Sequence, residues 1–294
     1  MNNPSTEMEF AINLAREAGA NMRMAFERHL VRRMLRKLKP EDHTPLTETD
    51  QRNDDLIRER VAKDFPGVAL ITEEGEIVTG TGDIAAVGDP VDGTIPFSNG
   101  VPTSVFSFAF TRAGKPFVAV IYDPFTNKMY TAELGKGAFC NDERVSVGGN
   151  KKLDKGLIVG MGWGYSQRDM SLVDLELRRR SIVILELCTC AYSGAMVASG
   201  HFDISAYPVW LPWDVAAVDL LVKEAGGVST DLFGNEQLAD RKVNGCLVAN
   251  PWLHEEFAKL NNTLIPREEI NGQKELKEKL RELKEFSQKL ISGI

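Results

Sequence analysis

Apolar and polar positions alternate with two different periods along the chain, and together these periods predict an α+β protein. Phe10, Leu14 and Ala18 recur at helical spacing, which predicts a helix from about Ser5 to Leu38. Four further stretches carry helical signals, at about 49–63, 191–199, 214–225 and 252–260. The stretch at 214–225 is followed by a glycine pair, which is typical of a helix end.

Runs rich in valine, isoleucine and phenylalanine predict strands between these helices. SVFSFAF, FVAVIY and KMYTAEL alternate with turns, and GKGAFCNDERV adds a hairpin that turns at Asn141-Asp142, so an antiparallel sheet is predicted there. Later strands, at about 157–164, 182–188, 202–206 and 245–250, are interleaved with helices. A polar stretch near 150–155 predicts a boundary between an N-terminal α+β sub-domain, 1–150, and a C-terminal α/β sub-domain, 151–265.

Composition and charge narrow the possible partners. The 294 residues are 43% hydrophobic and 26% charged, as expected of a soluble globular protein. A net charge of −7 leaves no global basic field, so we expect no nucleic-acid polymer as a partner. Apolar runs are too short for a membrane span, so we expect no membrane partner and a cytoplasmic location. The four cysteines form no C-x-x-C pair and are expected to be reduced thiols.

The stretch GDPVDGTIPF, residues 88–97, carries the most informative chemistry. Its two carboxylates, Asp89 and Asp92, flank Pro90, which favours an extended conformation before it, and Gly93 permits a tight turn. Thr94 can cap the helix that follows. A strand, an acidic turn and a helix start in this order can hold hard cations and a phosphate group. An ordinary Asp-Gly turn fits this stretch equally well when it is taken alone.

Two further acidic motifs favour the cation site over an ordinary turn. They are the Glu73-Glu74 pair in LITEEGE and Asp214 in LPWDVAAVDLLVKEAGG. With GDPVDGT they occur in an order that resembles the inositol monophosphatase family, within the magnesium-dependent, lithium-sensitive sugar phosphatases, over residues 8–260. Each motif alone is weak, whereas the combination is specific. The resemblance implies a layered αβαβα sandwich of the inositol monophosphatase and fructose-1,6-bisphosphatase type, with an antiparallel N-terminal sheet and a smaller mixed C-terminal sheet.

The resemblance also implies a metal site, most of it in the N-terminal sub-domain. Two or three Mg²⁺ ions per site, which Mn²⁺ can replace, are expected with Glu74 nearby. The implied ligands are Glu73, Asp89, the Val91 carbonyl, Asp92 and Asp214.

Catalytic and phosphate-binding residues follow from the same resemblance. The amides of Gly93 and Thr94 are expected to bind phosphate, and Thr94 with Asp50 is expected to orient a metal-activated water, with Glu73 as a further catalytic group. Asp50 taken alone is a helix cap. Lys39 stands eleven positions before Asp50, the family's spacing for a lysine near the site. The basic cluster around Lys39, taken alone, is more typical of a solvated helix end.

The expected activity is hydrolysis of a small sugar or polyol phosphate. Tyr207 stands seven positions before Asp214, where inositol-specific members have a ring-binding glutamate, so it is the candidate substrate contact. Ile95-Pro96 replaces the family's Thr-Asn. Alternatives are fructose-1,6-bisphosphatase activity, 3′-phosphoadenosine 5′-phosphate phosphatase activity and a catalytically silent metal-binding or regulatory homologue. The resemblance implies inhibition by lithium and a homodimer.

A C-terminal extension, 266–294, lies outside the resemblance. Leu276, Leu280, Leu283 and Leu290 recur at helical spacing, which predicts an amphipathic helix. A lone helix of this length is marginal in water, so we expect it to pack on its own subunit or on a partner helix.

Overall fold

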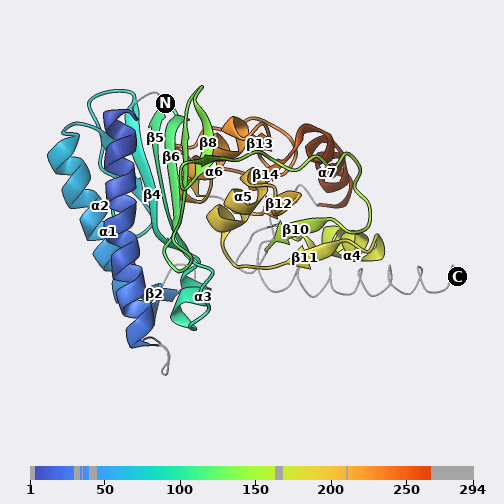
Figure 1. The fold of residues 1–294 in the computed structure, drawn as a ribbon, viewed down its shortest axis with the longest axis horizontal. Coiled ribbons are helices and arrows are strands. Elements are labelled where there is room, and N and C mark those ends of the chain that lie inside the picture. Colours follow the sequence, from blue (N-terminus) through green and yellow to red (C-terminus); the bar gives the residue numbers. More distant parts are fainter. Residues whose placement is uncertain are drawn as a thin grey trace, which may run out of the picture.

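The computed structural model describes residues 4–29, 34, 36–39, 45–162, 168–209 and 211–265. Its helices and two large sheets form five layers in the order helix, sheet, helix, sheet, helix (Figure 1). The first layer, α1 (Thr6–Arg28) and α2 (Glu48–Asp64), runs side by side over one face of the larger sheet. This order confirms the predicted αβαβα sandwich.

The larger sheet has seven strands in the order β3-β4-β5-β6-β7-β8-β9. Strands β4 to β9 pair antiparallel, whereas β3 pairs parallel with β4, so the sheet is mixed at that edge. The predicted turn at Asn141-Asp142 joins β8 to β9, and both residues have positive φ. The strands are β3 (Ala69–Thr72), β4 (Ile84–Asp92), β5 (Val105–Arg112), β6 (Lys115–Asp123), β7 (Lys128–Glu133), β8 (Gly137–Cys140) and β9 (Glu143–Arg144).

Alternation along β5 divides the core between the two faces of this sheet. Phe106, Phe108 and Phe110 are fully buried on the face that α1 and α2 cover. Val105 and Ala109 point to the opposite face and join the cluster around the middle helix layer. Successive side chains of a strand point to opposite faces. The large aromatic residues therefore pack against α1 and α2, and the smaller residues pack against the middle helix layer.

The middle layer consists of α5 (Cys190–Ala198) and α6 (Pro212–Glu224), which pack between the two sheets. The second sheet has five strands in the order β11-β10-β12-β14-β13, with parallel pairs on one side of β12 and antiparallel pairs on the other. The predicted smaller mixed sheet is thus confirmed. Its strands are β10 (Ile158–Met161), β11 (Val183–Leu185), β12 (Ile204–Tyr207), β13 (Val228–Thr230) and β14 (Cys246–Ala249).

The outer layer consists of α4 (Ser171–Arg179) and α7 (Pro251–Leu264), which cover the far face of the five-stranded sheet. Arg178 and Arg179 at the end of α4 pair with acidic residues of their own helix, as expected of a solvated helix end. The division into sub-domains stays a prediction, and the 266–294 extension lies outside the described residues. Each helix that the structure describes is too short or too polar to cross a membrane.

The predicted helix from Ser5 to Leu38 is wrong in its second part. Helix α1 ends at Arg28, and β1 (Arg36–Leu38) instead pairs antiparallel with β2 (Pro45–Thr47). Pairing with β2 satisfies the backbone of 36–38 in extended form, and the proline after Lys39 favours an extended conformation at Lys39 as well. The extended segment also carries Lys39 to a buried position, where it meets two glutamates.

Candidate functional site

The acidic turn sits at an irregular end of β4. Asp89 pairs with Ser107 of β5 and Asp92 pairs with Val105, so three steps on β4 oppose two on β5. In a regular strand, residues three positions apart point to opposite faces. The bulge adds one residue to β4, which offsets this alternation and brings both carboxylates to the same face of the sheet. The Val91 amide donates to Asp89 Oδ1 at 2.9 Å, which fixes the first carboxylate.

Gly93 turns the chain from β4 into α3 (Thr94–Ser98). Its φ of 90° lies in the left-handed region, and a Cβ at this position would meet atoms of Pro96, Ser104 and Thr189 at 3.2 Å each. Gly93 therefore occupies the N-cap position, and the prediction that Thr94 caps this helix is wrong. The Thr94 hydroxyl lies instead 2.9 Å from Asp50 Oδ1 and 3.1 Å from the Val91 carbonyl.

Asp214 completes a cluster of three carboxylates. It lies in the first turn of α6, which begins at Pro212. Asp89, Asp92 and Asp214 each place one carboxylate oxygen within 4.8 Å of the others. The chain thus brings together residues from a strand of one sheet and from a helix between the two sheets.

Burial and mutual repulsion set the electrostatics of this cluster. Burial, followed by the charges of Glu73, Asp92 and Asp214, raises the pKa of Asp89 well above its ordinary value. Burial and the charges of Asp92 and Glu73 likewise raise the pKa of Asp214. Burial raises the pKa of Asp92 to about 6, although hydrogen bonds from α5 oppose that shift.

The donor set fits a hard divalent cation. Carboxylate and carbonyl oxygens are the ligands that Mg²⁺ and Mn²⁺ prefer, and three crowded carboxylates repel one another unless a cation or protons compensate. Asp89, Asp92 and Asp214 supply such oxygens, with the Val91 carbonyl beside Thr94. The geometry therefore provides an acidic centre of the predicted kind, in which each residue's role as a ligand stays a prediction.

Asp50 serves both the start of α2 and the acidic turn. Its Oδ2 accepts the Thr47 amide at 2.9 Å and the Thr47 hydroxyl, in a capping box that begins the helix. Its Oδ1 faces the Thr94 hydroxyl, 44 positions away in sequence. Burial raises the pKa of Asp50 to about 6, against the hydrogen bonds that it accepts. The two roles considered for Asp50, a helix cap and a partner of Thr94, are thus geometrically compatible.

Lys39 reaches the Glu73-Glu74 pair. Its Nζ lies 2.7 Å from Oε1 of each glutamate, and its side chain is only 9% exposed. Burial lowers the pKa of Lys39, but attraction to the two carboxylates outweighs burial and raises it above the ordinary value. Burial and the charge of Glu73 raise the pKa of Glu74 to about 8, against the ion pair with Lys39. Lys39 is therefore placed in the acidic site, and its contact with phosphate stays a prediction.

Tyr207 is buried beside the site. Its hydroxyl lies 3.0 Å from the Ser193 hydroxyl of α5, and its ring fills the space beside Gly162. This phenol is thus held by the core through its ring and its hydroxyl. A substrate contact through Tyr207 stays a prediction.

Three polar residues support the turn although the sequence did not single them out. Ser104 donates to the Gly93 carbonyl at 2.7 Å, and Asn53 of α2 donates to the Pro90 carbonyl at 3.1 Å. The Thr189 hydroxyl donates to Asp92 Oδ2, 97 positions away in sequence. A threonine before a helix signals an N-cap, but its contact with Asp92 exists only in the folded chain.

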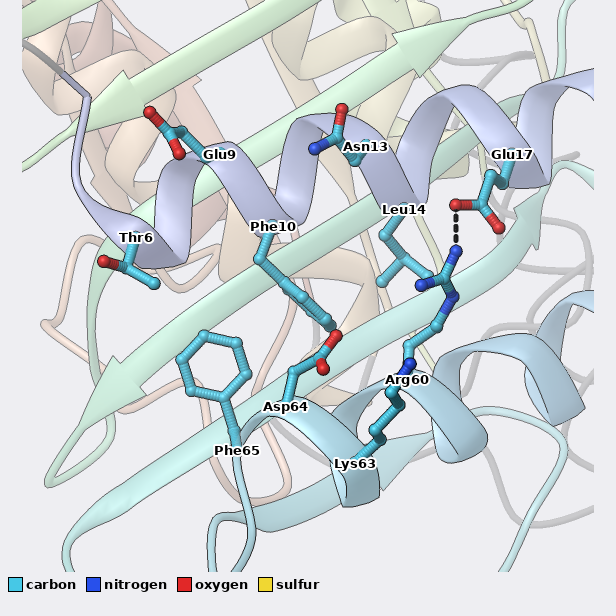
Figure 2. Close-up of a pocket in the computed structure, with 10 residues that line it drawn as sticks. All are labelled: Thr6, Glu9, Phe10, Asn13, Leu14, Glu17, Arg60, Lys63, Asp64 and Phe65. Atoms are coloured by element: carbon cyan, nitrogen blue, oxygen red, sulfur yellow. Dashed lines mark hydrogen bonds and ion pairs between the residues drawn. The ribbon is translucent and has the colours of Figure 1, made fainter.

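A separate pocket lies between α1 and α2 (Figure 2). Phe10, Leu14 and Phe65 form its apolar part, and an ion pair between Glu17 and Arg60 crosses it. Its α2 residues lie at the C-terminal end of that helix, whereas Asp50 lies at the start, about 20 Å away at 1.5 Å per residue. The predicted site residues do not line this pocket.

The layers and the acidic centre define a class of α+β protein with a carboxylate cluster suited to a hard cation beside its middle helix layer. The chain belongs to the inositol monophosphatase family, whose model matches residues 3–265. It is 35% identical over 230 residues to the Thermotoga maritima fructose-1,6-bisphosphatase/inositol-1-monophosphatase, which covers 77% of this chain and 85% of that protein. It is 32% identical over 254 residues to the Nus factor SuhB of Pasteurella multocida, covering 82% and 90% respectively.

Solved structures agree with this assignment. The extragenic suppressor protein SuhB from Bartonella henselae superposes with a TM-score of 0.79 at 26% identity, covering 87% of this chain and 98% of that one. A Thermotoga maritima IMPase superposes with a TM-score of 0.77 at 30% identity, covering 88% and 98%.

Proposed function

We propose that the chain is a Mg²⁺-dependent phosphomonoesterase that hydrolyses a small sugar or polyol phosphate. One observation carries this proposal: Asp89, Asp92 and Asp214 converge within 4.8 Å beside a Thr94 hydroxyl that is hydrogen-bonded to the buried Asp50. Membership of the inositol monophosphatase family supports it. A cation site alone has many uses, but a cation site next to an oriented hydroxyl suits hydrolysis.

The proposed ligands divide into two overlapping sets. Glu73, Asp89 and the Val91 carbonyl would hold one ion, and Asp89, Asp92 and Asp214 would hold another. When bound, divalent ions in such a site supply Lewis-acid activation of water and neutralise charge on the phosphate and the leaving group. Mn²⁺ is expected to replace Mg²⁺, because both prefer oxygen ligands.

Thr94 and Asp50 are proposed to orient the attacking water. A hydroxyl has one hydrogen to donate, and Asp50 Oδ1 and the Val91 carbonyl are its two possible acceptors. The Asp50 carboxylate is the stronger acceptor when it is ionised, so the hydrogen is assigned to Asp50 Oδ1. Thr94 Oγ1 is then left as an acceptor, so it can receive a hydrogen from water and pass a proton towards Asp50.

The turn at Gly93 is proposed to hold the phosphate. Glycine leaves the backbone amides of Gly93 and Thr94 open to close approach, and any larger residue would be strained at a φ of 90°. The phosphate would therefore lie on these amides, with its ester oxygen near the carboxylate cluster.

The structure around Tyr207 supports a substrate other than inositol 1-phosphate. A neutral phenol, already bonded to Ser193, stands where inositol-specific members have a glutamate for the ring. The name of the Thermotoga maritima relative favours fructose 1,6-bisphosphate as a second candidate. The Nus factor name of other relatives keeps a catalytically silent regulatory role as the alternative.

A substrate panel tests the proposal. Inositol 1-phosphate, fructose 1,6-bisphosphate, 3′-phosphoadenosine 5′-phosphate and p-nitrophenyl phosphate are each incubated with Mg²⁺, with EDTA and with the Asp89→Asn protein. We expect phosphate release that requires Mg²⁺ and the wild-type residue. A folded protein that releases no phosphate from any of these esters with Mg²⁺ would favour the silent role. Light scattering on the same protein tests the expected homodimer.

A further inference from the structure

Asp92 receives two hydrogen bonds from the start of helix α5. The Thr189 hydroxyl and the Ala191 amide, the latter at 2.7 Å, both donate to Asp92 Oδ2. Asp92 ends a strand of the seven-stranded sheet, whereas the two donors belong to the middle helix layer. All these groups are buried, with Thr189 1% and Asp92 5% exposed. Solvent therefore competes little with these bonds.

Thr189 is fixed on both sides of its hydroxyl. Its hydrogen goes to Asp92, while its oxygen accepts the Tyr192 amide at 3.2 Å as the N-cap of α5. A β-branched side chain has few χ1 rotamers, so both bonds constrain a single conformation. The Thr189 Cβ also lies close to Gly93. Thr189 thus contacts the acidic turn through one carboxylate and one glycine.

These bonds determine which oxygen of Asp92 is free. A carboxylate oxygen has two lone pairs, and the two donors occupy both lone pairs of Oδ2. Oδ1 receives neither of these bonds and is left for a cation, and rotation of the carboxylate would break two buried hydrogen bonds. Groups that orient metal ligands in this way commonly set metal affinity.

We propose that Thr189 is a positioning residue that fixes Asp92 in the orientation needed to bind a divalent cation together with Asp89 and Asp214. The inference rests on the proposed function in one respect only, namely that this cluster binds a cation. It adds that helix α5, nearly a hundred residues along the chain, sets the affinity of the site.

The test measures cation binding rather than turnover. Mg²⁺ and Mn²⁺ are titrated by calorimetry into wild type, Thr189→Val and Thr189→Ser, and thermal unfolding is recorded for each without metal. Valine keeps the shape and removes the donor, whereas serine keeps the hydroxyl. We expect Thr189→Val to bind roughly 10- to 100-fold more weakly, as for other residues that support a ligand, and Thr189→Ser to bind within about threefold of wild type.

Two further variants separate positioning from helix capping. Ser5→Ala removes the N-cap of α1 and leaves the acidic site untouched, so it should lower stability without changing cation affinity. Thr189→Gly removes the hydroxyl, and glycine is nearly as good an N-cap, so it decides the question if Thr189→Val does not fold.

The outcomes distinguish this inference from the proposed function. Wild-type affinity in folded Thr189→Val or Thr189→Gly would overturn the positioning role and leave the proposed function standing. A loss in Thr189→Ser as large as in the valine variant would also overturn it, because the hydroxyl would not be the cause. A folded wild-type protein that binds neither cation would overturn both.

Discussion

Lys39 Nζ lies 2.7 Å from a carboxylate oxygen of Glu73 and 2.7 Å from one of Glu74. One buried ammonium thus compensates two adjacent carboxylates, and removing it leaves buried negative charge without a partner. We expect Lys39→Met to destabilise the metal-free protein by about 3 kcal/mol, the cost of breaking a buried pair from one side. Added Mg²⁺ should reduce the difference in stability between wild type and Lys39→Met, since a bound cation can neutralise the charge of the glutamates in place of the lysine.

Urea unfolding with and without Mg²⁺ measures this effect. Lys37→Met is the matched control, because Lys37 is exposed on β1, two residues before Lys39. An equal loss of stability in Lys39→Met with and without Mg²⁺ would show that the lysine and the cation do not share the same carboxylates.

Asp89→Asn should abolish activity and keep the fold. The amide retains the shape of the proposed bridging ligand and removes its charge, so turnover should fall by at least ~10²-fold. The metal-free protein should be slightly more stable, because one member of a repelling cluster is gone. Steady-state kinetics at saturating Mg²⁺ check the first expectation, with exposed Asp83→Asn as the control. More than a tenth of wild-type turnover would argue against Asp89 as a ligand.

Thr94→Ala should separate catalysis from metal binding. It removes the hydroxyl that lies 2.9 Å from Asp50 and leaves every proposed metal ligand in place. We expect kcat to fall by ~10²–10⁴ with little change in Mg²⁺ affinity, and Thr94→Ser to restore most of the loss. If calorimetry showed the opposite, weak binding with nearly normal kcat, Thr94 would have a structural role.

The stability of the metal-free protein should fall as pH rises. In the folded state the pKa of Asp92 is raised to about 6 and that of Glu74 to about 8, and those of Asp89 and Asp214 are raised as well. A raised carboxyl pKa means that the folded state binds protons more tightly than the unfolded state. These groups therefore add their full contribution to the free energy of unfolding when the pH lies below their ordinary pKa values. That contribution is lost as the pH rises through their raised pKa values in the folded state.

Urea midpoints between about pH 5 and 8 measure this slope. With saturating Mg²⁺ the decline should become smaller, because the cation replaces the protons. Asp89→Asn should flatten the slope in the metal-free protein, since it removes one of the titrating groups. A midpoint that rises over this range without metal would contradict the expected sign.

Lithium should inhibit hydrolysis at millimolar concentration, as the family resemblance implies. A monovalent ion is expected to occupy the site of Asp89, Asp92 and Asp214 after the leaving group departs. Phosphate release at fixed Mg²⁺ and increasing LiCl measures this, with NaCl at equal ionic strength as the control. Activity that does not change with LiCl would indicate that Asp92 and Asp214 do not form the expected second cation site.

Local signals in the sequence predicted most of the helices and strands, whereas the order of the layers and the acidic centre followed only from the family resemblance that the three acidic motifs carry together. Helical and strand periods mark the elements, and GDPVDGT marks its own turn. The end of α1 was mispredicted, because the apolar period continues past Arg28 and the contact between Lys39 and the glutamates is invisible in sequence. The bulge in β4 and the bond from Thr189 to Asp92 depend on register and on packing between layers, which no local pattern encodes.

The distance in sequence between the parts of the acidic site has a consequence during synthesis. Asp92 leaves the ribosome 97 residues before Thr189, and Asp214 follows later still. The seven strands of the larger sheet all precede residue 145, so that sheet can begin to form while its acidic turn still lacks α5 and α6. The three-carboxylate centre therefore cannot exist in a nascent chain that has not exposed residue 214. A cation that needs all three carboxylates can therefore be bound only after most of the chain has been made.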